Sequence, residues 1–264
     1  MTAMSVTDDS RATLTVERGL EVLRAFRSER VALGNAELVR RTGFSKAVVS
    51  RITSTLLVLG FLRRVAGTRQ FELGTRALSL GQAYIENSPI ASAAEPLLQS
   101  MADDLDVSTA LAMRDHTDML YIAYCKGARI ATLRLGVGSV LPMALTSVGR
   151  CYLWACPEPG RRALMSAIRD KAGAQADQVE AGILRAFNDL DLRGFASSVF
   201  EYQRDVFGVA VPVLVGRDRT LMALNCGAVE PGVKLQKIRK NIVPRLKATA
   251  KELEAALADI EDVP

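Results

Sequence analysis

The sequence has little of the chemistry on which most enzymes depend. It contains a single histidine, His116, in the segment RDHTD, and none of the patterns G-x-S-x-G, H-E-x-x-H or the P-loop. A nucleophilic Ser-His or Cys-His pair would have to be built on that one histidine. Cys226 lies in the apolar segment LMALNCGAV, which favours an inert buried thiol over a reactive one. The residues therefore predict no catalytic site.

Metal-binding patterns, signal sequences and long apolar runs are also missing. The four cysteines form no C-x-x-C pair, so we expect neither a zinc site nor a disulfide framework, and no metal or cofactor. No stretch is apolar and uncharged for long enough to span a membrane. Residues 1–12 lack a basic-then-apolar leader and predict a flexible tail. These absences favour a cytoplasmic protein with reduced thiols.

Positive charge is concentrated in the first third of the 264 residues. Residues 11–86 contain 13 Lys and Arg against 6 Asp and Glu, a net charge of +7. Residues 87–264 contain 21 of each sign and are neutral. A basic segment joined to a neutral one is typical of a polyanion-binding domain followed by a second domain. The chain is long enough for both.

The basic segment has the helical pattern of a winged helix-turn-helix. Apolar residues recur at helical spacing in LTVERGLEVLRAF and in SKAVVSRITSTLLVLG, where Ser45 is a suitable N-cap and Gly60 ends the helix. A short helix, NAELVRRT, lies between them and can end at Gly43. The segment FLRRVAGTRQFELG then predicts a β-hairpin. We therefore predict a winged helix-turn-helix domain over residues 13–75.

The outer face of the third predicted helix is small and polar, with one long cation. This face suits the major groove of duplex DNA, where Arg51 can reach the paired acceptors of guanine. The hairpin would lie along the backbone or in the minor groove. A protein-interaction module with the same helices is the alternative. The expected DNA-binding residues are Ser45, Lys46, Ala47, Ser50, Arg51, Arg63, Arg64, Arg69 and Gln70.

The rest of the chain predicts an α+β domain over residues 91–264, joined by a helical linker over residues 76–90. Strands are expected in VSTALAMRD, MLYIAYCKG, RIATLRLG, FASSVF, FGVAVPVLVG and TLMALNCGAV. Helices are expected at about residues 90–105, 147–155, 158–170 and 176–190, and one long amphipathic helix over residues 233–260 despite Pro244. Segregated strands and helices indicate an antiparallel sheet flanked by helices.

One loop in this region carries a candidate binding feature. The segment GVGSVLPMALTSVGRC delivers Thr146 and Ser147 to the start of a predicted helix. Free N–H groups and hydroxyls at a helix N-terminus favour a bound anion, including a carboxylate. The alternative is that Thr146 or Ser147 only caps the helix.

Several segments together resemble the IclR (isocitrate-lyase-regulator) family of bacterial transcription factors, from about Leu14 to Ile260. They are VERGLEVLRAF, AELVRRTGFSKAVVSRITSTLLVLGFLRR, FELGTRALSLG, LPMALTSVGRCYLWA, RGFASSVFE and GVAVPVLV. The resemblance implies an N-terminal winged helix-turn-helix, a helical linker and a C-terminal GAF-like domain that binds a small effector.

The resemblance also implies partners and a pocket. Members of the IclR family assemble as homodimers or homotetramers, commonly repress transcription, and respond to a small organic or aromatic acid. For a two-fold assembly we expect a roughly palindromic double-stranded DNA operator. A C-terminal domain that only oligomerises is the alternative. The implied effector-binding residues are Thr146, Ser147, Val148, Ser198, Gly208, Asn225 and Gly227.

Overall fold

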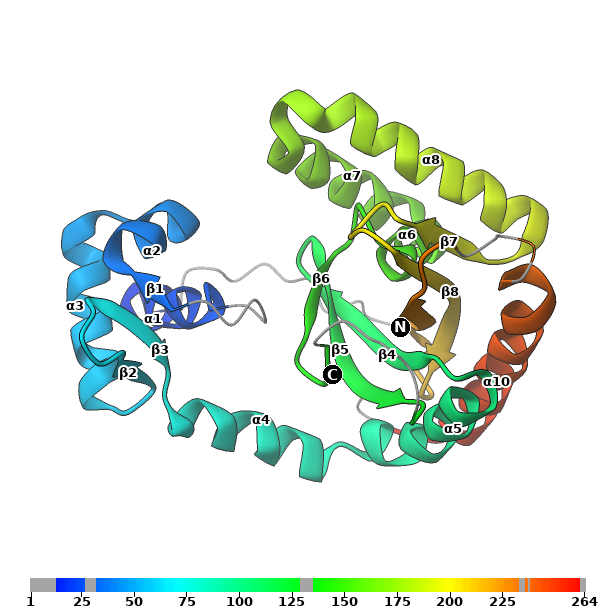
Figure 1. Ribbon diagram of the computed structural model, residues 1–264, viewed down its shortest axis with the longest axis horizontal. Coiled ribbons are helices and arrows are strands. Elements are labelled where there is room, and N and C mark those ends of the chain that lie inside the picture. Colours follow the sequence, from blue (N-terminus) through cyan, green and yellow to red (C-terminus); the bar gives the residue numbers. More distant parts are fainter. Residues whose placement is uncertain (1–12, 27–31, 129–134, 233–235, 237, 262–264) are drawn as a thin grey trace. The chain divides into compact units, whose positions relative to one another are not determined.

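The computed structural model (Figure 1) describes residues 13–26, 32–128, 135–232, 236 and 238–261. The chain forms two compact units that meet between Tyr84 and Ile85, and each is described by itself. The predicted tail, residues 1–12, lies outside the described residues. No helix in the part of the chain described here is long and apolar enough to cross a bilayer.

The first unit is the predicted winged helix-turn-helix. Its helices are α1 (Leu14–Arg24), α2 (Asn35–Thr42) and α3 (Lys46–Val58), and its strands are β1 (Leu33–Gly34), β2 (Leu62–Arg64) and β3 (Gln70–Leu73). The strands pair antiparallel in the order β1-β3-β2, so β2 and β3 form the predicted hairpin. The short strand β1 was not predicted, because two residues carry no alternation pattern.

Local sequence signals set the geometry of this unit. Gly43 has φ +72°, in the left-handed region, and turns the chain between α2 and α3. The Ser45 hydroxyl accepts a hydrogen bond from the Val48 N–H at 3.4 Å, as an N-cap does. Arg41 donates to the Ala25 carbonyl at 3.0 Å and ties α2 to the end of α1. The core beneath these helices contains Val22, Leu38, Val49, Ile52, Leu62 and Phe71.

Two helices follow the hairpin. Helix α4 spans Thr75–Asn87, and α5 (Pro89–Leu105) begins after Ser88, whose hydroxyl accepts from the Ala91 N–H at 3.2 Å. Every residue of α4 is described and none is buried. Helix α5, by contrast, buries Ile90, Ala94 and Leu98 in the core of the second unit.

The second unit is built on an antiparallel sheet. Among the described residues it contains β4 (Ser108–Asp115), β5 (Asp118–Lys126), β6 (Val140–Pro142), β7 (Ala196–Val199), β8 (Val206–Val215) and β9 (Thr220–Val229). Their order is β6-β5-β4-β9-β8-β7. His116 and Thr117 form the turn between β4 and β5. Strand β6 was not predicted, since three residues are too few to show an alternating pattern.

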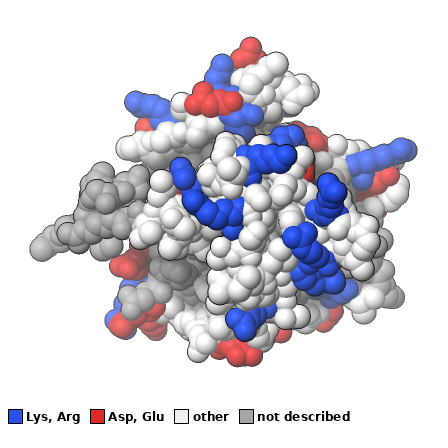
Figure 2. Space-filling model, turned by 90° about the vertical axis from the view of Figure 1, so that its left-hand side faces the viewer, with Lys and Arg blue, Asp and Glu red and all other residues white. Residues whose placement is uncertain are grey.

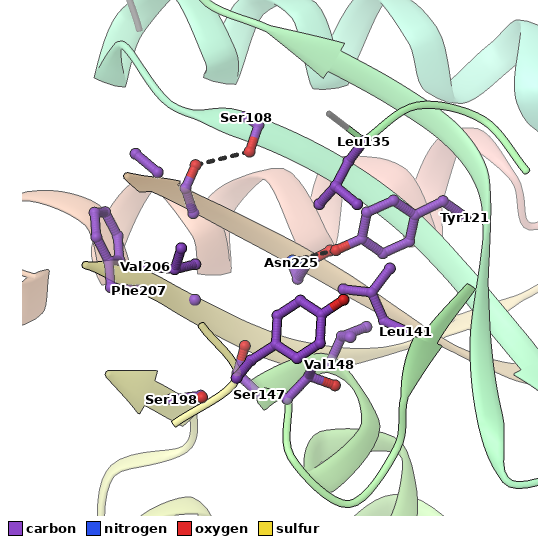
Figure 3. A pocket seen from close by; sticks show the side chains of 15 residues that line it. Ser108, Tyr121, Leu135, Leu141, Ser147, Val148, Ser198, Val206, Phe207 and Asn225 are labelled. Carbon is purple, nitrogen blue, oxygen red and sulfur yellow. Dashed lines mark hydrogen bonds between the residues drawn. The ribbon is translucent and has the colours of Figure 1, made fainter. Parts of the chain in front are cut away.

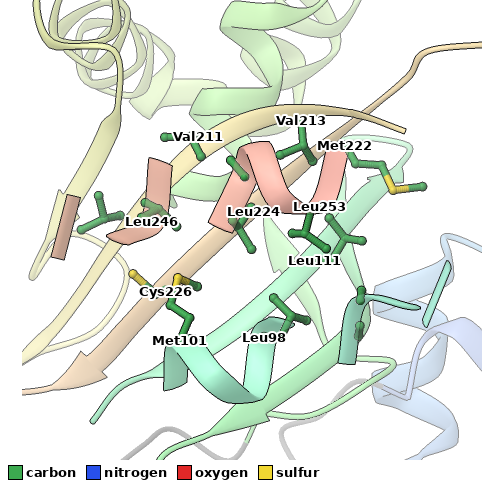
Figure 4. Close-up of a cluster of buried hydrophobic side chains, with 14 of the residues drawn as sticks. Leu98, Met101, Leu111, Val211, Val213, Met222, Leu224, Cys226, Leu246 and Leu253 are labelled. Atoms are coloured by element: carbon green, nitrogen blue, oxygen red, sulfur yellow. The ribbon is translucent and has the colours of Figure 1, made fainter. Parts of the chain in front are cut away.

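Helices cover both faces of this sheet (Figure 1). Helices α5 and α10 (Val243–Ala256) pack on one face, and α6 (Ser147–Ala155), α7 (Glu158–Ala172) and α8 (Ala176–Arg193) form the layer on the other. A short 3-10 turn, Gly173–Gln175, joins α7 to α8. Figure 4 shows the core of the α5/α10 face, where Leu98 and Leu246 from the helices meet Leu224 from the sheet. The α+β prediction is confirmed.

Over the described residues the predicted C-terminal helix is not uniformly α-helical. A π-helical turn occupies Ile238–Ile242, and α10 starts only at Val243 and ends at Ala256. Pro244 lies in the first turn of α10. A proline lacks the N–H that a helix interior needs, but the first turn has no use for that donor. Most of the predicted strand RIATLRLG, and residues 233–235, lie outside the described residues.

Candidate DNA-binding surface and effector pocket

The exposed face of α3 carries five of the predicted DNA-binding residues. Lys46, Ala47, Ser50 and Arg51 are exposed on the helix, and Ser45 caps its start. Helix α3 contains no acidic residue, and in the described part of the chain neither Lys46 nor Arg51 has an acidic partner. Viewed from the side of α2 and α3, Lys and Arg side chains lie across the middle of the face (Figure 2).

The hairpin carries the other four. Arg63 is exposed and forms an ion pair with Glu72 on the neighbouring strand. The Arg64 guanidinium lies 5.4 Å from the centre of the Phe71 ring. Arg69 and Gln70 are exposed beyond the turn. The hairpin therefore presents cations that are only partly neutralised within the protein.

The second unit contains a cavity of about 50 Å³ between the start of α6 and the sheet (Figure 3). All seven residues expected at the effector site line it, although they come from four segments of the chain: the start of α6 and strands β7, β8 and β9. The other lining residues are Ser108, Tyr121, Leu135, Leu141, Tyr202, Val206, Phe207 and Ala228.

Strand alternation brings the sheet residues to this cavity. On β9, Leu224 and Cys226 point into the α5/α10 core, so Asn225 and Gly227 lie on the opposite face. Gly208 on β8 pairs with Gly227. A Cβ at Gly208 would lie 2.8 Å from the Ser147 Oγ, so the glycine allows α6 to approach the sheet.

Thr146 and Ser147 have different roles at the helix start. The Thr146 hydroxyl accepts from the Gly149 N–H at 3.3 Å and donates to the Pro142 carbonyl at 2.8 Å. Thr146 is thus the N-cap. The Ser147 hydroxyl has no hydrogen-bond partner among the described residues, and its first-turn N–H has no acceptor within the helix. An anion in the cavity would find these donors free.

A second polar group in the cavity wall is incompletely paired. The Asn225 side-chain amide donates to the Tyr121 hydroxyl at 3.1 Å, and burial raises the pKa of Tyr121, so that phenol stays neutral. The Asn225 Oδ1 is buried and has no hydrogen-bond partner, while the residue is 9% exposed. Buried acceptors are normally paired, so this oxygen is an exception among the polar groups of the cavity wall.

Two residues brace the pocket through bonds to the loop before α6, and one of them, Ser198, also lines the cavity. Ser198 donates to the Leu145 carbonyl at 3.1 Å, which ties β7 to the loop before α6. Arg150 does not line the cavity. Its Nε donates to the Ala144 carbonyl at 2.9 Å, and its terminal nitrogen lies 2.8 Å from a Glu201 carboxylate oxygen. Arg150 is therefore not the counter-charge for a ligand in the cavity.

The structure offers little support for metal or thiol chemistry. Among the described residues no group of three His, Cys, Asp or Glu side chains is placed to hold a metal ion. Cys226 faces the α5/α10 core, where burial raises the pKa of its thiol to about 12. A thiolate is the reactive form, so Cys226 is unsuited to nucleophilic chemistry.

Sequence reasoning missed Tyr121 and Tyr202. Alternation along β5 places Tyr121 on the same side as Met119, so the pattern in MLYIAYCKG held a signal for it. Tyr202 lies on an irregular loop between β7 and β8, for which periodicity carries no information.

Comparison with known proteins identifies the class. The family profile described as "IclR helix-turn-helix domain" matches residues 15–66, and that described as "Bacterial transcriptional regulator IclR C-terminal" matches residues 82–255. The chain is a bacterial transcriptional regulator of the helix-turn-helix type. It belongs to the IclR family.

Individual relatives span nearly the whole chain. An HTH-type transcriptional regulator TsaQ1/TsaQ2 of Comamonas testosteroni is 28% identical over 245 residues, which cover 92% of this chain and 88% of the relative. The crystal structure of an IclR family regulator from Brucella abortus is 35% identical, with a TM-score of 0.82, covering 100% of this chain and 97% of that one. An IclR homolog from Microbacterium hydrocarbonoxydans, complexed with 4-hydroxybenzoate, shares the fold at 19% identity and a TM-score of 0.62, with 92% and 98% covered.

Proposed function

We propose that the protein is a repressor that binds duplex DNA and changes its DNA affinity when a small organic or aromatic acid occupies the cavity of the second unit. Family membership supports transcriptional regulation. Beyond family membership, we propose the class of ligand, repression as the effect on transcription, and the residues that contact DNA and ligand. A role on DNA places the protein in the cytoplasm.

The exposed α3 face supports direct reading of bases. Arg51 and Ser50 lie one turn into the helix, where a recognition helix faces the base edges of the major groove. Lys46 lies at the helix start, where phosphate contacts are common. We assign base reading to Arg51 and Ser50 and backbone contacts to Lys46, Arg63, Arg64 and Arg69.

The start of α6 supports carboxylate binding. The free hydroxyl and N–H of Ser147 lie at the positive end of a helix dipole. Among the described residues, no acidic side chain lines the cavity. A carboxylate at this position would gain hydrogen bonds and meet no like charge.

One observation carries the effector proposal: the buried Asn225 Oδ1 has no partner. A hydroxyl group on the ligand would supply the missing donor, which favours a hydroxylated acid over a plain one. The Microbacterium homolog, whose bound 4-hydroxybenzoate is an acid of this kind, is consistent with this proposal. Leu135 and Leu141 would contact the apolar part of such a ligand.

Helix α4 supports assembly with a second copy of the chain. On a helical wheel its apolar residues share one side, and Leu78, Leu80, Tyr84 and Ile85 are 71%, 61%, 39% and 37% exposed. An apolar helix face without any buried residue marks an interaction surface. A two-fold pair of recognition helices would read a roughly palindromic operator.

A thermal-shift screen on the full-length protein tests the effector proposal. Benzoate, 4-hydroxybenzoate and pyruvate at millimolar concentration are the probes. A ligand that binds only the folded protein raises Tm, by mass action. We expect a rise with at least one acid and release of selected duplex DNA by the same acid. No shift with any carboxylate would favour the alternative, a C-terminal unit that only oligomerises.

A further inference from the structure

The loop of residues 200–205, which joins β7 to β8, forms one wall of the cavity. Tyr202 lines the cavity and packs against the buried cluster that contains Tyr121, Leu141 and Val148. The loop is closed at its base by the Phe200 N–H, which donates to the Val206 carbonyl at 2.8 Å. Phe200 and Asp205 at its two ends both have φ +62°, in the left-handed region that non-glycine residues seldom adopt. The loop therefore turns sharply at both ends.

An ion pair between a buried arginine and a partly exposed glutamate, whose side chain is 37% exposed, holds this loop to α6. The Arg150 side chain is 4% exposed, and its partner Glu201 is the residue next to Tyr202. A Cβ at Gly182 on α8 would lie 2.8 Å from the Arg150 terminal nitrogen, so this glycine leaves room for the arginine to reach the loop. Separating the pair would leave a buried guanidinium without its counter-charge, which is strongly unfavourable. The pair thus resists outward movement of the loop.

The cavity is small for the ligands that relatives bind. Its volume is about 50 Å³. An apolar cavity that admits benzene measures roughly 150 Å³. The observed arrangement has room for a few heavy atoms, as in a short aliphatic acid, but an aromatic ring needs one wall to move. Among the described lining residues, both Leu135 and Tyr202 lie on irregular segments, and the segment that an ion pair ties to α6 is the one that contains Tyr202.

We infer that the loop of residues 200–205 is a gate to the cavity and that Tyr202 sets the size of the acid that enters. The Arg150–Glu201 ion pair, called the pin below, holds this loop in place. This inference rests on the proposed effector site. With the pin intact, Tyr202 closes the cavity around a small acid. An aromatic acid binds only when the loop moves outward, so its binding is coupled to the loop position.

Hydrogen exchange in the ligand-free, full-length protein tests the pin. Glu201→Gln keeps the side-chain size but removes the charge. We expect peptides covering residues 199–206 to exchange at least tenfold faster than in the parent. Arg204→Gln is the matched control, because Arg204 is on the same loop, is 95% exposed and contacts Asp205 instead of Arg150. Unchanged exchange in Glu201→Gln overturns the pin, as does equal acceleration in α10, which would mean general loosening.

Calorimetry with pyruvate and benzoate tests the role of Tyr202. Tyr202→Ala should raise the affinity for benzoate relative to pyruvate by at least tenfold. Phe200→Leu is the control, since Phe200 lies on the same loop, is 42% exposed and does not line the cavity. If the ratio of the affinities for benzoate and pyruvate is the same in Tyr202→Ala and the parent, Tyr202 does not set ligand size, and this result leaves the pin untouched. If neither protein binds either acid, the proposed effector site and the size role both fail, and hydrogen exchange still decides the pin.

Discussion

Gly208 on β8 lies directly against Ser147 at the start of α6: a Cβ at Gly208 would be 2.8 Å from the Ser147 Oγ. Its neighbour across the ladder, Gly227 on β9, has a different constraint. A Cβ at Gly227 would lie 2.3 Å from the Phe207 carbonyl oxygen, which belongs to the backbone. The first contact is with a side chain that can rotate, and the second is with a strand that cannot move freely. One glycine therefore shapes the pocket and the other shapes the sheet.

Exchanging each glycine for alanine separates these roles. Gly208→Ala should turn the Ser147 hydroxyl away from the cavity and weaken acid binding at least tenfold, with a stability change below about 1 kcal/mol. Gly227→Ala should destabilise the fold by about 1–3 kcal/mol, as overpacking against rigid structure does. Urea denaturation and calorimetry measure both quantities. Tight acid binding by Gly208→Ala would show that Ser147 does not contact the ligand.

Arg51→Ala should relax the sequence preference of DNA binding. Loss of a bidentate guanine contact costs about 1–3 kcal/mol on the preferred sequence and little on random DNA. Gel-shift titrations on a selected site and on random duplex measure the difference. Lys251→Ala, an exposed cation on α10, is the charge-matched control. An equal loss on both duplexes would remove Arg51 from base reading.

Lys46→Ala should weaken binding to all sequences alike. A phosphate contact contributes through counterion release, so the variant should lower the dependence of log K on log salt by about 0.9. Titrations at several salt concentrations give this slope. If the slope of log K against log salt is the same in Lys46→Ala as in the parent, Lys46 does not contact phosphate.

Ser147→Asp should abolish acid binding by placing a negative charge where the carboxylate is proposed to lie. Ser147 is 2% exposed and its Oγ faces Gly208, so the added carboxylate should also lower Tm, and binding is measured well below the Tm of the variant. Thr146→Ala is the companion variant. It removes the N-cap bond to Gly149, which should cost about 0.5–2 kcal/mol of stability without adding charge. If Ser147→Asp binds the best acid as tightly as the parent, the carboxylate lies elsewhere.

Charges on the apolar face of α4 should disrupt the proposed assembly. Leu78→Glu and Ile85→Glu each place a carboxylate within that face, and we expect a shift toward monomer at micromolar concentration. Ser79→Glu carries the same charge on the polar side of the helix and should leave the mass unchanged. Light scattering on the purified variants gives the mass. A parent protein that is monomeric both free and on DNA would rule out the second copy.

Thiol reactivity should follow burial. Burial raises the pKa of Cys125 to about 11 and of Cys226 to about 12, and it places Cys151 well above its ordinary range. Few thiolates then exist at pH 8, because that pH lies below these pKa values. Cys156 is only half-buried and should react first with a disulfide reagent, while all four react in denaturant. Rapid labelling of Cys226 in the folded protein would contradict its position in the core.

Some features of the fold followed from the sequence because they depend on neighbouring residues. Gly43 and Ser45 mark the turn and the start of α3 through backbone freedom and a cap three residues away, and both acted as predicted. Alternation in LMALNCGAV separates Asn225 from Cys226 onto opposite faces of β9, because successive strand residues point to opposite sides. Signals of this kind act over a few residues and need no knowledge of the rest of the chain.

Other features were decided only by tertiary contacts. Thr146 and Ser147 are equally good caps in the sequence. In the structure the Thr146 hydroxyl bonds to the Pro142 carbonyl and the Gly149 N–H, while the Ser147 hydroxyl lines the cavity. Asn225 meets Tyr121 across 104 positions of the chain, and Arg150 meets Glu201 through space that Gly182 leaves open. No periodicity in the sequence encodes such pairs. They form because pairing of the strands and packing of α6 and α8 on the sheet bring distant polar groups together in low-dielectric surroundings. An unpaired polar group is costly there, which favours partners from other parts of the chain.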